Sequence, residues 1–158
     1  MESPCYGTRM RARHLLGKRI RELRKSNVRR VAVVCHVEQY WSKLQGELEK
    51  AGLPVRVLER RGERLGGTQP IVVLSRPAHV GGQEFDAVLL VGLEAGLVPP
   101  RVVDNEALAA AVEQQALREI YLAVTRARFQ VGIIIAAGMS ATKIIADAEK
   151  ALLIRRRP

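Results

Sequence analysis

The sequence predicts an α/β domain in which a parallel sheet of about five strands is covered by helices on both faces. The segments expected to be strands are apolar throughout, which is typical of strands buried on both sides. They alternate along the chain with segments of helical periodicity, as in three-layer parallel folds. A chain of 158 residues, 47% of them hydrophobic, is sufficient for one buried core. We therefore expect a single domain over residues 1–158.

Five apolar runs are the expected strands. Between the second and the third, residues 59–70 are charged and rich in glycine and are expected to form a loop. Ligands of parallel sheets bind at loops that follow the carboxyl ends of strands, so the segments after Cys35, Leu74, Gly92 and Ala136 are the expected site loops. The five runs are residues 31–35 (VAVVC), 55–58 (VRVL), 71–74 (IVVL), 87–92 (AVLLVG) and 130–136 (QVGIIIA).

The helix expected over residues 9–25 has an apolar face and an opposite basic face. Apolar residues at helical spacing predict further helices over about 41–51 and 105–125, and a last helix with Ser140 at its N-cap. In the third helix the apolar face is expected to pack on the core. In the first helix the apolar face carries Leu16, Ile20 and Leu23, and the basic face carries Lys18, Arg21 and Lys25. In the third helix the apolar face carries Leu117, Ile120, Tyr121 and Val124.

The chain is basic, with 26 Lys and Arg against 16 Asp and Glu and a formal net charge of +10. Such a surface favours polyanions, with nucleic acid ahead of an anionic membrane, and the alternative is a surface that is basic without a polyanionic partner. Cys5 and Cys35 form no CxxC pair and no His cluster lies near them, so we expect no metal site and a cytoplasmic setting. No apolar run approaches the roughly 20 residues that span a bilayer, so no membrane partner is expected.

Two segments resemble motifs of the superfamily 1 helicases of the UvrD and Rep type. Residues 84–99 (EFDAVLLVGLEAGLVP) and 119–128 (EIYLAVTRAR) are similar to the family sequences E-F-D-x-V, G-L-x-E-G-x-x-P and Y-V-A-x-T-R-A, in the same order and spacing. Residues 18–58 also resemble the surroundings of the family's fourth motif. The resemblance implies the C-terminal of two RecA-like motor domains, a P-loop NTPase fold that lacks the Walker A half.

The resemblance implies an ATP site with Mg²⁺ that is shared with an N-terminal RecA-like domain. Arg126 matches the arginine finger, whose planar and permanently charged guanidinium can neutralise charge on a transferring phosphoryl group. The alternative for Arg126 is a cation favoured by the helix dipole. Glu84 matches a carboxylate that bonds the ribose, Gly82 matches a glycine near the phosphates, and Thr125 belongs to the arginine-finger signature. His36 replaces a nucleotide-contacting arginine, and its alternative role is structural.

The part of the sequence that corresponds to the family's DNA contacts differs from the motif. Family members read T-x-H-x-A-K-G, whereas this chain has Arg76, Ala78 and Gly81 in place of the threonine, histidine and lysine. Arg76 can bind a phosphate instead. The residues expected to contact single-stranded or partly duplex DNA are Arg76, His79, Lys18, Arg21 and Lys25.

No GxxxxGK sequence followed by Ser or Thr occurs, so the isolated chain is expected not to hydrolyse ATP. The first predicted function is the C-terminal motor domain of an ATP-dependent DNA helicase that works with an N-terminal RecA-like domain in cis or in trans. The alternative is a freestanding, degenerate domain that binds nucleic acid or a protein partner without ATPase activity. The short segment 59–69, where many relatives insert an accessory domain, predicts a minimal version of the fold.

Overall fold

The computed structural model describes residues 5–155, with side chains from residue 15 onward. Within these residues, strands and helices alternate as the sequence predicts, apart from the two crossovers described below. The elements are α1 (Cys5–Lys25), β1 (Arg30–Cys35), the 3-10 turn η1 (Glu38–Tyr40), α2 (Trp41–Lys50), β2 (Val55–Leu58), β3 (Ile71–Ser75), β4 (Phe85–Val91), α3 (Glu106–Val124), β5 (Ala127–Ile134) and α4 (Lys143–Lys150).

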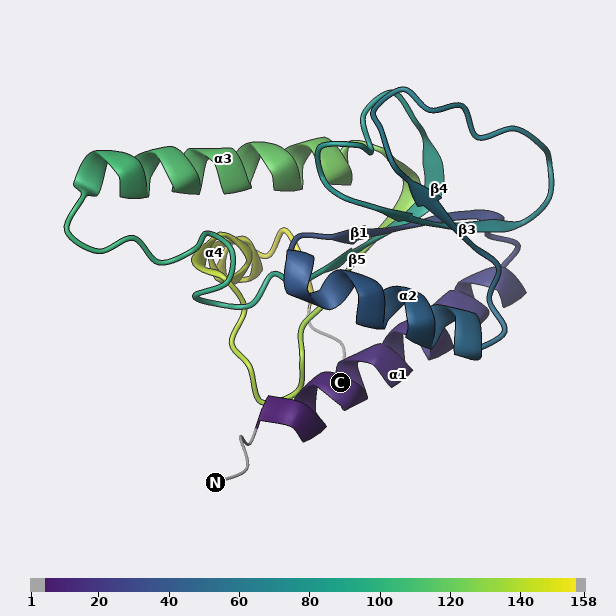
Figure 1. The fold of residues 1–158 in the computed structure, drawn as a ribbon, viewed down its shortest axis with the longest axis horizontal. Helices are drawn as coiled ribbons and strands as arrows, with labels where there is room; N and C mark the ends of the chain where they lie inside the picture. Colours follow the sequence, from purple (N-terminus) through teal and green to yellow (C-terminus); the bar gives the residue numbers. More distant parts are fainter. Residues whose placement is uncertain (1–4, 156–158) are drawn as a thin grey trace.

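The five strands form one sheet in the order β2-β3-β1-β4-β5, and every pair of neighbours is parallel. Helices α1 and α2 cover one face and α3 lies on the other, while α4 is beside the sheet and packs into the same core as α3 (Figure 1). The predicted fold class is therefore confirmed. No described helix is both long enough and apolar enough to cross a bilayer.

Two crossovers lack a helix and pass over the face that α3 occupies. Residues 59–70 connect β2 to β3, and residues 76–84 connect β3 to β4. Leu65 of the first packs against the core on this face, and Val80 of the second is buried in it. Both crossovers run from the carboxyl edge of the sheet to the amino edge, because the strands they join are parallel.

Strand residues alternate between two cores, one on each face of the sheet. The core under α1 and α2 contains Leu16, Ile20, Leu23, Leu44 and Leu48 with Val31, Val33, Leu74 and Leu89. The core under α3 and α4 contains Ala32, Val34, Val73, Phe85, Val88 and Leu90 with Ala116, Ile120, Ala123 and Ile145.

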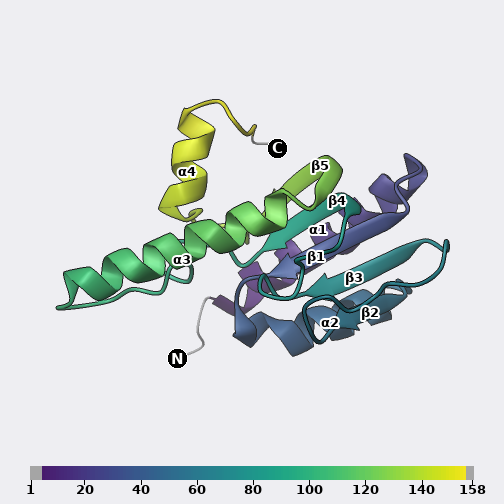
Figure 2. The same cartoon turned by 90° about the horizontal axis from the view of Figure 1, so that it is seen from above.

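The predicted packing face of α3 is wrong except at Ile120. Leu117 and Tyr121 are 52% and 70% exposed, and Val124 is 36% exposed. The buried face is the neighbouring one, which carries Ala116, Ile120 and Ala123. Two of these side chains are methyl groups, which let the helix lie close to β4 and β5. The amino-terminal half of α3 extends beyond the sheet (Figure 2).

Several boundaries also differ from the prediction, among them the starts of β5 and of the last helix. Strand β5 begins at Ala127 rather than at residue 130, because Ala127 already pairs with Phe85 of β4. The last helix has Thr142 at its N-cap rather than Ser140. The backbone N–H of Thr142 donates to the carbonyl of Leu93, and this bond fixes the start of α4.

Candidate functional site

Four of the predicted ATP-site residues lie at the amino edge of the sheet. Thr125 and Arg126 form the joint between α3 and β5, and Gly82 and Glu84 precede β4. The backbone N–H of Phe85 donates to the carbonyl oxygen of Arg126 at 2.9 Å. This bond joins residues 41 positions apart in the sequence and places Glu84 beside Arg126 along the edge.

The Arg126 guanidinium has few hydrogen-bond partners within the described part of the domain. One terminal nitrogen donates to the Thr125 hydroxyl at 3.4 Å, a long hydrogen bond, and the Thr125 hydroxyl donates to the carbonyl of Leu122 at 2.9 Å. The Arg126 Nε is buried and has no hydrogen-bond partner among the described residues. An unpaired, buried N–H of a charged group is costly, and a partner from outside can reach this Nε only if the side chain moves. The terminal nitrogen at the exposed contact with Thr125 is the donor that an outside anion would meet first.

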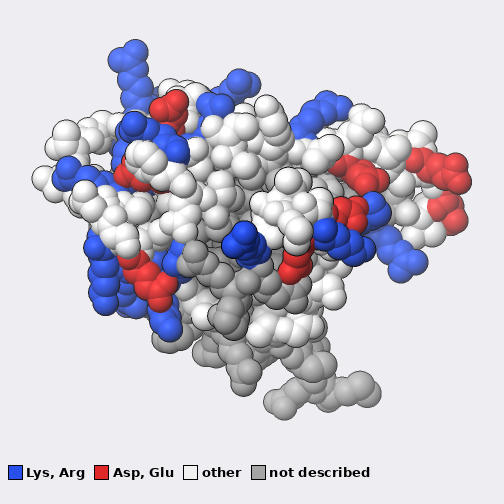
Figure 3. Space-filling model, turned by 180° about the vertical axis from the view of Figure 1, so that it is seen from behind, with Lys and Arg blue, Asp and Glu red and all other residues white. Residues whose placement is uncertain are grey.

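The amino edge is strongly basic. Arg29, Arg30 and Arg128 lie here with Arg126, and the Arg30 guanidinium sits 5.9 Å from the centre of the Phe85 ring. Lys and Arg side chains gather at this end of the molecule, where α1 ends and β1 begins (Figure 3, at left). Asp86 is, with Glu84, an acidic residue of this edge, and its carboxylate accepts backbone hydrogen bonds from Arg29 and Arg30, both at 2.9 Å.

His36 does not join the other predicted ATP-site residues. It follows β1 at the carboxyl edge, where its backbone N–H donates to the carbonyl of Val91 at 3.0 Å. Strand β4 runs from Phe85 to Val91 between the two edges. At a rise of roughly 3.3 Å per residue, the edges are about 20 Å apart. One nucleotide site at Arg126 therefore cannot include His36 in this arrangement of the chain.

Arg76 also lies at the carboxyl edge, next to His36. It follows Ser75, which pairs with Val34 of β1. The Arg76 guanidinium lies over the Trp41 ring, 5.1 Å from its centre, and forms an ion pair with Glu38. Two predicted residues, His36 and Arg76, thus follow neighbouring strands at this edge. The Arg76 side chain contacts Trp41 and Glu38, which the sequence analysis did not single out.

Comparison with known proteins finds a structural match to the fold but no sequence match. No protein-family model and no curated protein matches the sequence. Among solved structures, the C-terminal domain of a possible DNA helicase from Lactobacillus plantarum WCFS1 superposes with a TM-score of 0.66. The two chains are 17% identical, and the match covers 89% of this chain and 75% of the other. The chain has the RecA-like fold of a helicase C-terminal domain.

Burial controls the chemistry of two side chains at the carboxyl edge of this RecA-like fold. Burial lowers the pKa of His36 from 6.5 to about 4, and the nearby carbonyls of Val91 and Val34 oppose this shift only in part. Both ring nitrogens are buried without a partner of ordinary hydrogen-bond geometry in the described residues. Burial likewise raises the pKa of the Cys35 thiol to about 11. His36 is therefore neutral at pH 7 and Cys35 is an inert thiol.

Glu94 is a further residue of the carboxyl edge that sequence reasoning missed. It is only 1% exposed, and its Oε1 accepts the backbone N–H of Ala136 at 3.2 Å, which ties the end of β4 to the end of β5. The sequence did contain an indication of this role, because Glu94 lies in the segment GLEAG immediately after a buried strand. Its Oε2 is buried and unpartnered within the described residues.

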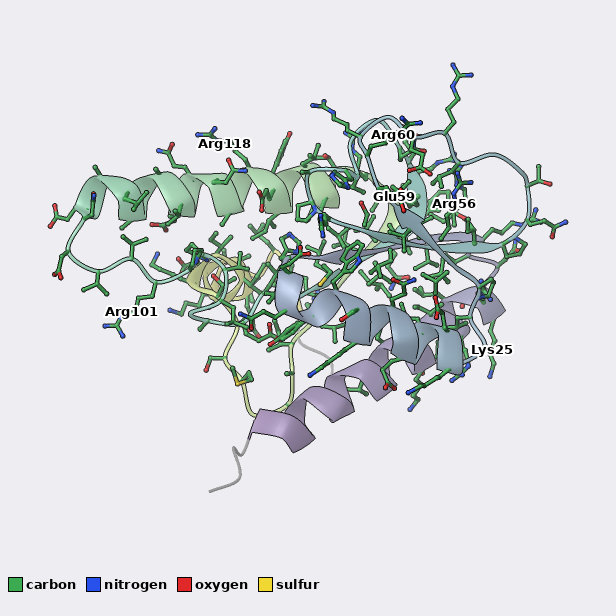
Figure 4. All side chains as sticks on the ribbon, viewed as in Figure 1. Lys25, Arg56, Glu59, Arg60, Arg101 and Arg118 are labelled. Carbon is green, nitrogen blue, oxygen red and sulfur yellow. The ribbon has the colours of Figure 1, made fainter. Side chains whose placement is uncertain are left out.

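His79, which is half-buried, ties the 76–84 crossover to the end of β2. Its Nδ1 lies 3.1 Å from the carbonyl oxygen of Leu58. Glu63 bonds Arg56 at 3.1 Å and accepts the backbone N–H of Glu59 at 3.2 Å, so that the 59–70 loop is anchored to β2. Arg56, Glu59 and Arg60 lie together where β2 meets this loop (Figure 4).

The three predicted DNA contacts on α1 are in different surroundings. Lys18 and Lys25 are exposed, and Lys25 is at the end of the helix, near the amino edge (Figure 4). Arg21 instead donates to the carbonyl of Ala51 at 2.6 Å and so caps the C-terminus of α2. The predicted site residues therefore divide into three groups: the amino edge, the carboxyl edge and the outer face of α1.

Proposed function

We propose that this chain is the C-terminal motor domain of an ATP-dependent DNA helicase similar to the UvrD and Rep type. One observation carries the proposal: Arg126, Thr125, Gly82 and Glu84 converge at the amino edge, although they come from separate segments of the chain. The Arg126 terminal nitrogen makes only a long, exposed hydrogen bond to Thr125, so a phosphate oxygen from outside can compete for it.

In this proposal the residues of the amino edge form one half of a site for ATP with Mg²⁺. Arg126 neutralises charge on the γ-phosphate, and Glu84 accepts a hydrogen bond from the ribose. Gly82 has a positive φ of 80° and no side chain, so its backbone can approach a phosphate closely. The described residues contain no group of three metal-ligating side chains. The Mg²⁺ ligands and the phosphate-binding lysine belong to the N-terminal RecA-like domain.

The surface beside Arg126 fits contact with that second domain. Tyr121 and Leu117 of α3 are 70% and 52% exposed, and Phe129 of β5 is 73% exposed. An apolar surface of this kind commonly marks a protein interface. Its position next to an arginine with an unpaired nitrogen is the arrangement expected where two domains close on a nucleotide.

The proposed DNA contacts lie at the carboxyl edge, where Arg76 is held at the end of β3. Nucleotide and DNA would then occupy opposite edges of one sheet. A change in domain closure at the amino edge moves the whole rigid sheet, and the carboxyl edge moves with it. This provides a physical link between ATP turnover and movement along a strand.

The proposal is tested by DNA binding to the native protein, including any domain that carries the Walker A sequence. Fluorescence anisotropy of a labelled oligothymidylate is measured at two salt concentrations, with and without a non-hydrolysable ATP analogue. We expect the analogue to change DNA affinity in the wild type and in Arg128→Ala, but not in Arg126→Ala. If the DNA affinity of the wild type is the same with and without the analogue, the proposal is contradicted.

A second candidate is a freestanding nucleic-acid-binding module without ATPase activity. The net charge of +10 favours it, as does the replacement of two motif residues by His36 and Gly81. It predicts DNA affinity that falls steeply with salt and is indifferent to nucleotide. The same titration therefore separates the two functions. A third outcome, no DNA binding at either salt concentration, indicates a basic face that contacts a protein.

A further inference from the structure

We propose that Trp41, Arg76 and Glu38 form a gated base-stacking site for single-stranded DNA at the carboxyl edge of the sheet. The three side chains come from different elements: Glu38 from η1, Trp41 from the start of α2, and Arg76 from the crossover after β3. This inference rests on the proposed DNA-binding function. It adds Trp41 as a residue that binds a base and Glu38 as a carboxylate that competes with a DNA phosphate for Arg76.

Trp41 has the surroundings of a stacking platform. It packs in part against the core beneath α2, which fixes the ring. One face of the ring is covered by the Arg76 guanidinium, at 5.1 Å from the ring centre, rather than by an apolar side chain. Nucleic-acid bases stack on aromatic rings and on arginine planes with similar geometry. A base can therefore replace the guanidinium over the indole.

Arg76 is held in place by an exposed carboxylate. Its terminal nitrogen pairs with Glu38, and the two side chains are 43% and 70% exposed. Exposed ion pairs are weak, so a phosphate can compete for the arginine. The Arg76 Nε is also buried with no partner among the described residues, so the guanidinium breaks no bond at this nitrogen when it moves off the ring.

These contacts define the binding event. A DNA phosphate replaces the Glu38 carboxylate as the partner of Arg76, the guanidinium moves off the ring, and a base stacks on Trp41. In the free protein Glu38 occupies the place of the phosphate. Removal of the Glu38 charge should therefore tighten DNA binding, and removal of the Trp41 ring should weaken it.

The chain contains one tryptophan and three tyrosines, so fluorescence excited selectively at tryptophan reports on this site alone. The purified chain is titrated with labelled oligothymidylate while anisotropy and tryptophan fluorescence are recorded together. We expect quenching to follow the anisotropy change. An abasic oligonucleotide of equal length, which has phosphates but no bases, should bind without this quenching.

Two pairs of variants test the contacts. We expect Glu38→Gln to raise affinity about two- to fivefold, whereas Glu47→Gln, which removes a charge elsewhere on α2, should have a smaller effect. Trp41→Leu should lower affinity about 5- to 50-fold, and Trp41→Phe should recover most of it. Leu108→Ala, which removes an exposed apolar side chain from α3, is the control for Trp41→Leu.

The outcomes distinguish this inference from the proposed function. If DNA binds without quenching, and Glu38→Gln and Glu47→Gln behave alike, the stacking site is wrong while the DNA-binding function stands. If the anisotropy does not change even at low salt, both are wrong. Quenching by oligothymidylate that is lost with the abasic strand supports the site.

Discussion

The carboxylate of Asp86, at the start of β4, accepts the backbone N–H of Arg30, at the start of β1, at 2.9 Å. The N–H of Arg29 donates to the same Oδ2 at 2.9 Å. These two bonds fix where β1 and β4 begin, next to the segment that carries Arg126. The amino edge is thus built around a carboxylate that binds backbone groups, while the surrounding arginine side chains remain available.

Replacement of Asp86 should destabilise the domain. Burial alone would raise the pKa of this carboxyl, but hydrogen bonds from Arg30 and Arg29 and the charges of Arg128 and Arg30 outweigh it and lower the pKa. Asp86→Ala leaves two backbone N–H groups without this partner, so we expect a loss of about 1–3 kcal/mol in the free energy of unfolding. Urea denaturation measures it. Asp147→Ala on the exposed surface of α4 is the control, and an equal loss there would contradict the prediction.

Gly92 should tolerate no side chain. Its φ is +90°, and an added Cβ would lie 2.9 Å from Val37 Cγ2 and 3.2 Å from the Val37 backbone nitrogen. We expect Gly92→Ala to cost at least about 1–3 kcal/mol of unfolding free energy. In contrast, an added Cβ at Gly46 of α2 meets nothing within 4 Å, so Gly46→Ala should stabilise the helix by about 0.5–1 kcal/mol. If the denaturation midpoints of Gly92→Ala and Gly46→Ala shift in the same direction, the two predictions are refuted.

Stability should fall in mild acid because of His36. The folded protein binds a proton at this ring less tightly than the unfolded chain, with a pKa of about 4 against 6.5. Protonation below pH 6.5 therefore favours unfolding, and stability is highest above that pH. Between pH 6.5 and about 4 the loss from this group is up to roughly 3 kcal/mol.

The measurement is the unfolding free energy at several values of pH in wild type and His36→Gln. We expect the dependence on pH between 6.5 and 4 to be shallower in the variant. His79→Gln is a matched substitution at a ring that bonds Leu58. Wild type and His36→Gln curves of equal slope would show that the buried ring is not the cause.

Arg126 and Arg128 should differ in their effect on catalysis. Arg126 has a buried, unpartnered Nε, whereas Arg128 is exposed and lies over the Phe129 ring at 5.3 Å. If the proposed function holds, Arg126→Ala should lower the kcat of ATP hydrolysis by about 10³-fold in a protein that carries both motor domains. Arg128→Ala should change it by less than about threefold. Similar losses in both variants would argue that the edge acts only through its total charge.

The sequence by itself determined the layered parallel sheet, because strands buried on both faces must be apolar at every position. It also determined that Arg126 follows a helix and that Glu84 precedes a strand, since both facts depend on local order along the chain. Only the tertiary structure decided which of these residues meet. Strand register brought Glu84 beside Arg126 and left His36 at the opposite edge.

The orientation of α3 was also decided by packing. Leu117, Tyr121 and Val124 repeat with helical spacing as regularly as Ala116, Ile120 and Ala123, so periodicity alone cannot choose between the two faces. The small alanine side chains permit closer approach to the sheet, and that contact leaves the larger side chains exposed. The contacts of Arg76 with Trp41 and Glu38 likewise required the fold. They join strand ends that are adjacent in the sheet but more than 30 residues apart in the chain.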